Sequence, residues 1–138
     1  MDPRTGLKVL IADDSAELRQ RLRALIGDLA GVDTVLEAAD GLAALAAIRA
    51  TSFDAVILDL RMPGRTGMDV LLEARRLFPA LVLIVLTNYP YPAYRKRCIE
   101  NGANFFFDKN TEFMNAVEAV RGLVREPPRP PVFPMEEC

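Results

Sequence analysis

Short apolar runs alternate with longer segments of helical periodicity five times along this sequence. The apolar runs have the length of buried strands and lie at Leu7–Ala12, Val32–Ala38, Phe53–Leu58, Leu81–Leu86 and Ala103–Phe107. The fourth run is almost wholly aliphatic, which is typical of a central strand that is covered on both faces. Because strands that alternate with helices through short connections form parallel sheets, we expect an α/β fold in three layers, built on one doubly wound, five-stranded parallel sheet.

The segments between the apolar runs carry apolar residues at helical spacing. The residues expected on the apolar faces of the first three helices are Leu18, Leu22, Leu25, Ile26, Leu29, Leu42, Leu45, Ile48, Met68, Leu71, Leu72 and Phe78. Ser15 or Asp14 is expected to cap the first helix. The fourth helix is expected from Pro92 to Glu100, before the stop signal Asn101–Gly102. The apolar face of the fifth consists of Phe113, Ala116, Val117, Val120 and Val124.

Length and proline content indicate one domain followed by a segment of another kind. The chain has 138 residues, of which 51% are hydrophobic, and this is enough to build one core. Five of its ten prolines lie in the final stretch "REPPRPPVFPMEEC". Proline has no backbone N–H, so this stretch cannot continue a helix. We expect a folded domain over residues 1–126 and a disordered proline-rich tail or linker remnant over residues 127–138.

Charge, cysteine and histidine content exclude several classes of protein. The formal net charge is −2 and the pI about 5.2, whereas a dedicated nucleic-acid binder carries a basic face. No apolar run reaches membrane-spanning length, no signal peptide is visible, and two cysteines are too few for a disulfide framework or a zinc site. The absence of histidine excludes Ser-His-Asp and Cys-His catalysis. We expect a cytoplasmic protein that binds neither nucleic acid nor membranes.

Polar residues stand at the ends of four of the five predicted strands. Asp13 and Asp14 follow the first, Asp59 the third, Thr87 the fourth and Lys109 the fifth. Each alone has an ordinary structural explanation, because aspartate often forms caps and turns and lysine is usually a solvated surface charge. In doubly wound sheets, however, ligands bind outside the carboxyl ends of the strands. The five residues are therefore expected to form one site at one edge of the sheet.

These residue types together indicate phosphoryl transfer. Three converging carboxylates repel one another, but they are good ligands for Mg²⁺, which prefers oxygen ligands and leaves positions for phosphate oxygens. The hydroxyl of Thr87 and the ammonium of Lys109 complement the outer oxygens of a phosphoryl group. One carboxylate can then act as the nucleophile and form an acyl phosphate.

The most specific stretch of the sequence is "VILDLRMPGRTGMDVL", in which Asp59 is followed by Met62–Pro63, Gly67 and Leu71. It matches the pattern D-x-x-M-P-x-x-x-G-x-x-x-L of the receiver domains of two-component response regulators. The stretches "LIADDS", "VLTN" and "NGANFFFDK" match the other blocks of that family in order. Over roughly residues 6–125 the chain resembles a receiver domain. The resemblance implies a flavodoxin-like (βα)5 fold and a phosphorelay signalling module rather than an enzyme acting on other substrates.

The resemblance implies a separate role for each of the acidic residues. Asp59 matches the phosphoacceptor, which takes its phosphoryl group from a histidine kinase or a histidine phosphotransfer protein. Asp13 and Asp14 match the acidic pair that holds Mg²⁺, with the backbone carbonyl of Arg61 as a further ligand. Such a domain catalyses only its own phosphorylation and dephosphorylation.

The resemblance also implies a switch. Thr87 matches the hydroxyl that turns toward the phosphoryl group, Lys109 matches the lysine that pairs with it, and Phe106 matches the aromatic residue whose rotamer is coupled to Thr87. Simple core packing is the alternative for Phe106. Alternation along a strand would point Phe105 and Phe107 to one face and Phe106 to the other, which favours the switch role.

The sequence departs from the family pattern at two positions. Asn110 follows Lys109 where the family usually has a proline in a cis bond, and Asn88 follows Thr87 where alanine or glycine is usual. A cis bond before a residue other than proline costs about 2.5–4 kcal/mol. Asn110 is also a good N-cap for a helix that begins near Glu112. We therefore predict a trans Lys109–Asn110 bond and a loop shifted from the usual path, while Asn88 is expected near the approach path of the phosphoryl group.

All three tyrosines of the chain fall in the stretch "NYPYPAYRKRC", which also holds three consecutive basic residues. Tyrosine and arginine are enriched in interface hot spots. The equally weighted alternative is that the tyrosines pack beneath a loop and the charges form a solvated helix face. Because this region matches the output face of receiver domains, we expect a downstream protein to bind Tyr89–Arg97 and the fifth-helix face. A phosphorylation-dependent dimer is left open.

Two other functions compete with the signalling interpretation. A phosphatase of the haloacid dehalogenase type also uses an Mg²⁺-bound aspartyl nucleophile, but it needs a second acid two residues later, where this chain has Arg61. A scaffold of the same fold that is not phosphorylated is the other alternative, against which the complete acidic set argues. A P-loop nucleotidase is excluded, because no G-x-x-x-x-G-K-[ST] motif occurs. Whether the chain stands alone or belongs to a longer one is left open.

Overall fold

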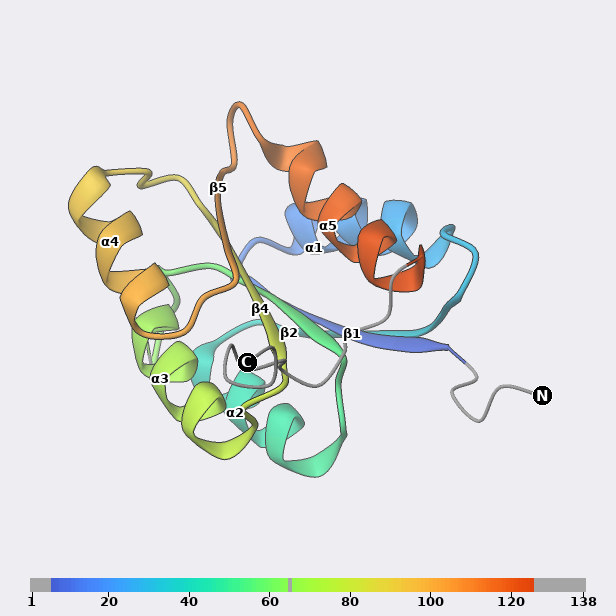
Figure 1. Cartoon of the computed structure of the whole chain (residues 1–138), viewed down its shortest axis with the longest axis horizontal. Helices are drawn as coiled ribbons and strands as arrows, with labels where there is room; N and C mark the ends of the chain where they lie inside the picture. The colour runs from blue at the N-terminus through green and yellow to red at the C-terminus, as the bar shows by residue number, and fades with distance from the viewer. Residues whose placement is uncertain (1–5, 65, 126–138) are drawn as a thin grey trace, which may run out of the picture.

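The computed structural model describes residues 6–64 and 66–125, which form an α/β fold in three layers (Figure 1). In this part of the chain, five parallel strands form one sheet in the order β2-β1-β3-β4-β5. The strands are β1 (Leu7–Ala12), β2 (Val32–Ala38), β3 (Ala55–Leu58), β4 (Val82–Thr87) and β5 (Phe105–Asp108). The helices are α1 (Ala16–Gly27), α2 (Gly41–Ala50), α3 (Gly67–Leu77), α4 (Pro92–Glu100) and α5 (Phe113–Arg125). The predicted fold class is confirmed.

Two hydrophobic clusters lie between the sheet and its helices, one on each face of the sheet. One cluster joins the sheet to α2, α3 and α4, and the other joins it to α1 and α5, so the helices cover both faces (Figure 1). Along β1, the side chain of Leu10 enters the first cluster while Val9 and Ile11 enter the second. This is the alternation expected of a strand buried on both faces. The chain order reverses between β1 and β3, which places a topological switch point beside their carboxyl ends.

Three leucines predicted on the apolar helix faces are exposed instead. The exposed fraction is 37% for Leu25, 61% for Leu42 and 43% for Leu72. On α1, Leu22 and Ile26 are fully buried, and Leu25 lies at the edge of their stripe. The contact between a helix and a sheet covers only part of the apolar arc that the sequence presents. The cap of α1 is Ser15, whose Oγ accepts a hydrogen bond from the backbone N–H of Leu18.

Some predictions from the sequence concern segments that lie outside the described residues. The proline-rich segment 127–138 and the domain boundary at residue 126 are among them. Within the described ranges, no helix is both long and apolar enough to cross a membrane.

Packing differs sharply between β4 and the segment that follows it. Every residue of β4 is buried, whereas Cys98 is the one buried residue of α4. Because segments with few buried contacts open most readily, we expect the amides of residues 89–97 to exchange with solvent at least about tenfold faster than those of Val82–Thr87 in the unphosphorylated protein. Hydrogen exchange resolved by residue measures this directly. Equal protection of the two segments would contradict a mobile α4.

Candidate functional site

The polar residues predicted at the strand ends lie at the carboxyl edge of the sheet. Ala12 of β1 pairs with Leu58 of β3, so the residues that follow them, Asp13 and Asp59, emerge next to one another. A backbone hydrogen bond of 3.0 Å from the Asp59 N–H to the Ala12 carbonyl continues this pairing by one residue. The two carboxylates therefore meet because their strands are neighbours in the sheet, although they are far apart in the sequence.

Three carboxylates form a cluster at this edge. One carboxylate oxygen from each of Asp13, Asp14 and Asp59 lies within 4.8 Å of the other two. Asp13 and Asp59 are buried, with exposed fractions of 3% and 5%, while Asp14 is exposed. Three hard oxygen donors, two of them below the surface and one at it, suit a divalent cation that keeps some of its water ligands. The cluster could thus hold a metal ion.

Lys109 connects the cluster to β5. Its Nζ lies 2.7 Å from Oδ2 of Asp13 and 3.3 Å from Oδ2 of Asp59, and its side chain is only 10% exposed. The backbone N–H of Lys109 donates to the carbonyl of Thr87, which ties the loop to the end of β4. Lys109 thus contacts both buried carboxylates, and the ion pair with Asp13 is the shorter of the two.

The loop after Lys109 is held by Asp108 and Glu112. The Lys109–Asn110 peptide bond is trans, as predicted, since none of the described residues has a cis bond. The Asp108 carboxylate accepts a hydrogen bond from the Asn110 N–H, and the Glu112 carboxylate accepts one from the Asp108 N–H. The predicted N-cap role of Asn110 is wrong, because α5 begins only at Phe113 and Asn110 is used in the turn before it.

Burial controls the ionisation of Asp59. Removal of its carboxylate from water raises the pKa of Asp59 from 3.8 to about 6. The positive charge of Lys109 opposes this rise, and the negative charge of Asp13 adds to it. Without a metal ion, an ionised Asp59 is therefore costly for the fold, and a cation beside it would offset that cost.

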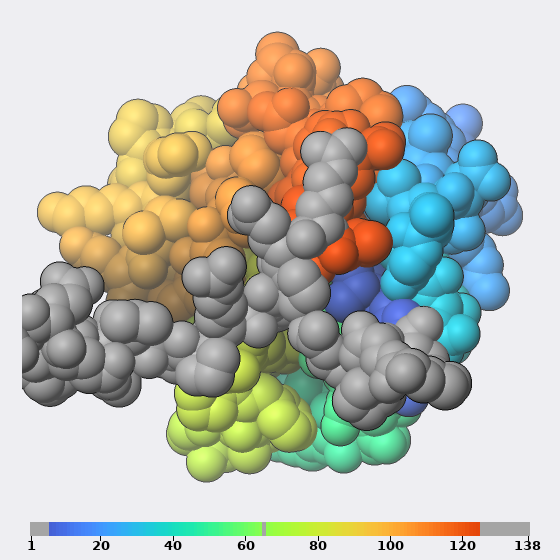
Figure 2. Space-filling model, turned by 45° about the vertical axis from the view of Figure 1, so that its right-hand side comes forward, coloured from blue at the N-terminus to red at the C-terminus, as the bar shows by residue number. Residues whose placement is uncertain are grey.

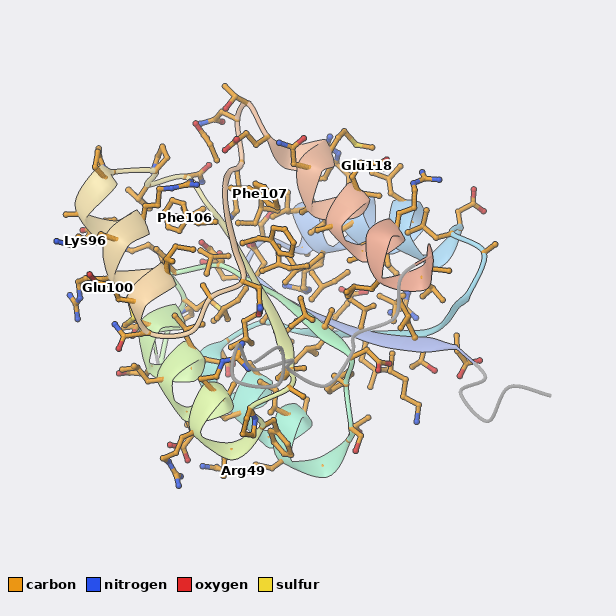
Figure 3. The ribbon with its side chains drawn as sticks, in the orientation of Figure 1. Arg49, Lys96, Glu100, Phe106, Phe107 and Glu118 are labelled. Atoms are coloured by element: carbon orange, nitrogen blue, oxygen red, sulfur yellow. The ribbon has the colours of Figure 1, made fainter. Side chains whose placement is uncertain are left out.

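Thr87 is the last residue of β4, the strand beside β3, and Phe106 lies on β5, the next strand along the sheet. Thr87 is fully buried, and its Oγ1 accepts a hydrogen bond of 2.9 Å from the Tyr89 N–H. Phe106 is 3% exposed and points toward the side of α4, whereas Phe107 points toward α5 (Figure 3). The predicted alternation of these side chains is confirmed. Arg95 of α4 lies over the Phe106 ring and donates to its carbonyl, so α4 contacts β5 at this residue.

Two residues outside the predicted set of site residues support the site. Arg19 donates to the backbone carbonyl of Asp13 at 2.7 Å and is paired with Glu37 of β2. Gly67 donates its N–H to the Leu60 carbonyl, directly after Asp59. Gly67 belongs to the receiver pattern and could be found from it. Arg19 could not, because its contacts depend on how α1 lies against β2.

Comparisons with known proteins agree with this geometry. The profile of the response regulator receiver domain matches residues 9–121. The chain is 36% identical over 106 residues to the uncharacterized transcriptional regulatory protein YhcZ of Bacillus subtilis, an alignment that covers 77% of this chain and 50% of YhcZ. It is 31% identical over 121 residues to the nitrate/nitrite response regulator NarP of Escherichia coli, with 88% and 56% covered. The chain thus spans about half the length of these relatives.

A solved structure gives the same result for the fold. The isolated receiver domain of RcsB from Salmonella enterica, determined in the presence of phosphomimetic BeF₃⁻, superposes with a TM-score of 0.80 at 25% identity. The match covers 91% of this chain and 94% of the RcsB domain. The comparisons give no support to a haloacid dehalogenase type of phosphatase.

Proposed function

The chain belongs to the response regulator receiver family, and from this premise we propose that Asp59 accepts a phosphoryl group from a phosphohistidine of a histidine kinase or phosphotransfer protein. The observation that carries the proposal is the position of the Asp59 carboxylate, which is buried beside Asp13 and paired with Lys109 at the carboxyl edge of the sheet. The same arrangement disfavours a scaffold that is not phosphorylated. Buried carboxylates that lie close together destabilise the fold, and such groups are concentrated at functional sites.

The proposed step uses groups of this chain for attack and for charge balance. A carboxylate oxygen of Asp59 attacks phosphorus, the phosphorus–nitrogen bond of the donor breaks, and its electron pair returns to the imidazole nitrogen. The product is an acyl phosphate on Asp59. Lys109, which now bridges Asp13 and Asp59, then pairs with an oxygen of the phosphoryl group. The domain would thus catalyse its own phosphorylation, and later its own dephosphorylation.

The oxygen atoms gathered at this edge of the sheet suit Mg²⁺. The proposed ligands are Asp13, Asp14, Asp59 and the backbone carbonyl of Arg61, with Asp13 acting largely through water. When bound, Mg²⁺ neutralises the negative charge of the carboxylates and of the phosphoryl oxygens. Arg61 already points its N–H toward Oδ1 of Asp59 at 3.4 Å, and its guanidinium lies over the Tyr89 ring.

Mg²⁺ is expected to stabilise the fold, and more strongly at pH 7.5 than at pH 5. Because the pKa of Asp59 is raised, its contribution to stability is present below about pH 4 and is lost as the pH rises through about 6. Mg²⁺ binds the ionised form, and at ten times its Kd it would raise the free energy of unfolding by about 1.4 kcal/mol. Thermal melts with and without Mg²⁺ at both pH values measure this. Coincident melts at pH 7.5 would contradict the metal site.

We place the switch in Thr87, Phe106 and the segment Tyr89–Arg97. The Thr87 hydroxyl accepts a hydrogen bond from the Tyr89 N–H, so a rotation of the Thr87 side chain toward a phosphoryl oxygen would break this bond and release the start of that segment. The contact of Arg95 with Phe106 would then carry the change into α4. A downstream protein is proposed to read this face together with α5, and phosphorylation to favour a dimer through it.

The boundaries and location of the unit are also proposed. Residues 1–126 are taken as the receiver domain and residues 127–138 as a tail or linker outside it. The profile match over residues 9–121 and the end of α5 at Arg125 support this division. A cytoplasmic location is proposed because two-component phosphotransfer from kinases takes place there.

Intact-mass measurement after incubation with acetyl phosphate tests the proposed function. One added phosphoryl group is expected with Mg²⁺ and none when the metal is chelated, because the carboxylate cluster requires a cation to approach a phosphate dianion. Peptide mapping should place the label between Val56 and Arg61. Absence of labelling, from acetyl phosphate and from a phosphorylated histidine donor alike, would refute the proposal.

A further inference from the structure

Asp14 is the least constrained member of the carboxylate cluster. It is exposed, whereas Asp13 and Asp59 are buried, and no hydrogen bond or ion pair joins its carboxylate to another residue in the described part of the chain. The Asp13 carboxylate, by contrast, is held on both oxygens, by the backbone N–H of Ser15 at 2.8 Å and by the Lys109 ammonium at 2.7 Å. The direction of the Asp14 side chain therefore depends on the backbone that carries it.

The peptide units on either side of the Asp14 Cα are both held by hydrogen bonds. The N–H of the second unit belongs to Ser15 and donates to Oδ1 of Asp13. The carbonyl of the first unit belongs to Asp13 and accepts a hydrogen bond of 2.7 Å from Nη1 of Arg19. Because a peptide unit is planar, a contact that holds its carbonyl also holds the N–H and the Cα that follow. Arg19 thus helps to fix the point from which the Asp14 side chain leaves the backbone.

Arg19 is itself held in place by β2. Its Nε donates to Oε1 of Glu37 at 2.9 Å, so one planar guanidinium joins Glu37 to the Asp13 carbonyl. The Arg19 side chain is only 16% exposed. α1 and β2 share the hydrophobic cluster on this face of the sheet, and in the space-filling view the blue surface of α1 adjoins the cyan surface of the segment that leads into β2 (Figure 2). The position of Arg19 therefore follows from the packing of α1 against β2.

Arg23 binds the same glutamate but does not contact the site. Its Nη1 lies 3.1 Å from Oε2 of Glu37, and its side chain is 53% exposed. It makes no hydrogen bond to Asp13 or Asp14. Arg19 and Arg23 thus carry the same charge and share one partner, but only Arg19 binds the Asp13 carbonyl. Arg23 is therefore a matched control for Arg19.

We propose that Arg19 is a positioning residue for the metal site, which it serves by holding the Asp13–Asp14 peptide unit so that the Asp14 carboxylate stays beside the other two. The proposal rests on the proposed function for the presence of Mg²⁺ at the cluster. A positive charge near a cation site repels the cation, so Coulomb forces alone would make removal of Arg19 strengthen metal binding. The positioning role predicts weaker binding, because a less constrained Asp14 must lose conformational freedom when it binds the metal.

Binding of Mn²⁺ to the unphosphorylated protein tests this role, because Mn²⁺ takes the same oxygen ligands as Mg²⁺. Water-proton relaxation measures the Kd of Mn²⁺, and competition measures that of Mg²⁺. Arg19→Gln is expected to raise both values about tenfold, the lower end of the effects of residues that orient metal ligands. Arg19→Lys, which keeps the charge but not the planar guanidinium, should raise them about threefold or more. Arg23→Gln should leave them within about a factor of two.

Labelling of Asp59 by acetyl phosphate separates positioning from a general loss of structure. The Arg19→Gln protein should need about tenfold more Mg²⁺ for half-maximal labelling, but its maximal rate should stay within about twofold of the wild type, because Asp59 and Lys109 are unchanged. Circular dichroism at the temperature of the measurement checks that each variant is folded. Should Arg19→Gln unfold, Arg19→Lys carries the same test.

Four results would overturn the proposal. Unchanged or tighter Mn²⁺ binding by the folded Arg19 variants would show that Arg19 does not orient Asp14. Equal weakening by Arg23→Gln would assign the effect to the shared partner Glu37. A lower maximal rate of labelling with an unchanged Mg²⁺ requirement would place Arg19 in the transfer step. Absence of Mn²⁺ binding to the wild type would refute the metal site of the proposed function, and this proposal with it.

Discussion

Replacement of Asp59 by asparagine is expected to abolish phosphorylation and to stabilise the metal-free fold. The side-chain amide is not a nucleophile toward phosphorus, so labelling by acetyl phosphate should fall below detection. The asparagine can still accept the hydrogen bond from the Arg61 N–H. Lys109 keeps its 2.7 Å ion pair with Asp13, which limits the loss from the second, longer contact with Asp59.

The stabilisation follows from the ionisation of Asp59. A pKa of about 6 in place of 3.8 means that the buried carboxylate opposes folding at neutral pH by up to about 3 kcal/mol. This figure already includes the attraction of Lys109, so a gain of up to about 3 kcal/mol in the free energy of unfolding is expected at pH 7.5. The gain should diminish below about pH 6, because the wild-type carboxyl group is then protonated. Urea denaturation at pH 5 and pH 7.5 measures both values.

Asp54→Asn is the matched control for Asp59→Asn. Asp54 stands at the other end of β3, is partly exposed, and accepts a hydrogen bond from the backbone N–H of Lys8 that asparagine can retain. This variant should be labelled like the wild type. A label that persists on the same peptide of the Asp59→Asn protein would show that another residue is the acceptor.

Gly67→Ala is expected to lower the free energy of unfolding by about 3 kcal/mol, because the new methyl group would overpack the backbone after β3. A Cβ at Gly67 would overlap the carbonyl oxygen of Asp59 and lie 2.5 Å from the Cα of Leu60. Both are backbone atoms, so they can move away only if the loop that carries Asp59 shifts. A lower rate of labelling at Asp59 should accompany the loss of stability.

Gly122→Ala provides the comparison for this substitution. A Cβ at Gly122, three residues before the end of α5, would meet no atom within 4 Å, and alanine is favoured over glycine inside a helix by about 1 kcal/mol. Urea denaturation should therefore show opposite signs for the two glycine-to-alanine changes. A Gly67→Ala protein as stable as the wild type would mean that α3 can move away from Asp59 at little cost.

The sequence by itself determined the fold class and which polar residues meet at the carboxyl edge of the sheet. The continuous apolar runs of β1 and β4 predict strands buried on both faces, and this depends only on residues close together in the chain. The position of a polar residue directly after a strand places it at the carboxyl edge of the sheet. Asp13, Asp59 and Lys109 could therefore be placed together before any contact was known.

The sequence predicts the ends of the strands and the exposure of the helix faces less accurately. β3 begins at Ala55 rather than Phe53, and β5 at Phe105 rather than Ala103. Leu42 is apolar and helical, yet it is the most exposed large hydrophobic residue in the described part of the chain. Periodicity reports that a residue belongs to an apolar stripe, but how much of the stripe is covered depends on the neighbouring layer.

Only the tertiary structure decided the relations between segments that are distant in the chain. Lys109 is closer to Asp13 than to Asp59, and Asp14 faces solvent while Asp13 is buried. Arg75 of α3 donates to the Gly102 carbonyl, 27 residues away, and so ties α3 to the loop that ends α4. The distances and burial that set the pKa of Asp59 arise when separate strands and helices pack at one edge. Local residue patterns do not predict that packing, because it depends on how the sheet and the helix layers assemble.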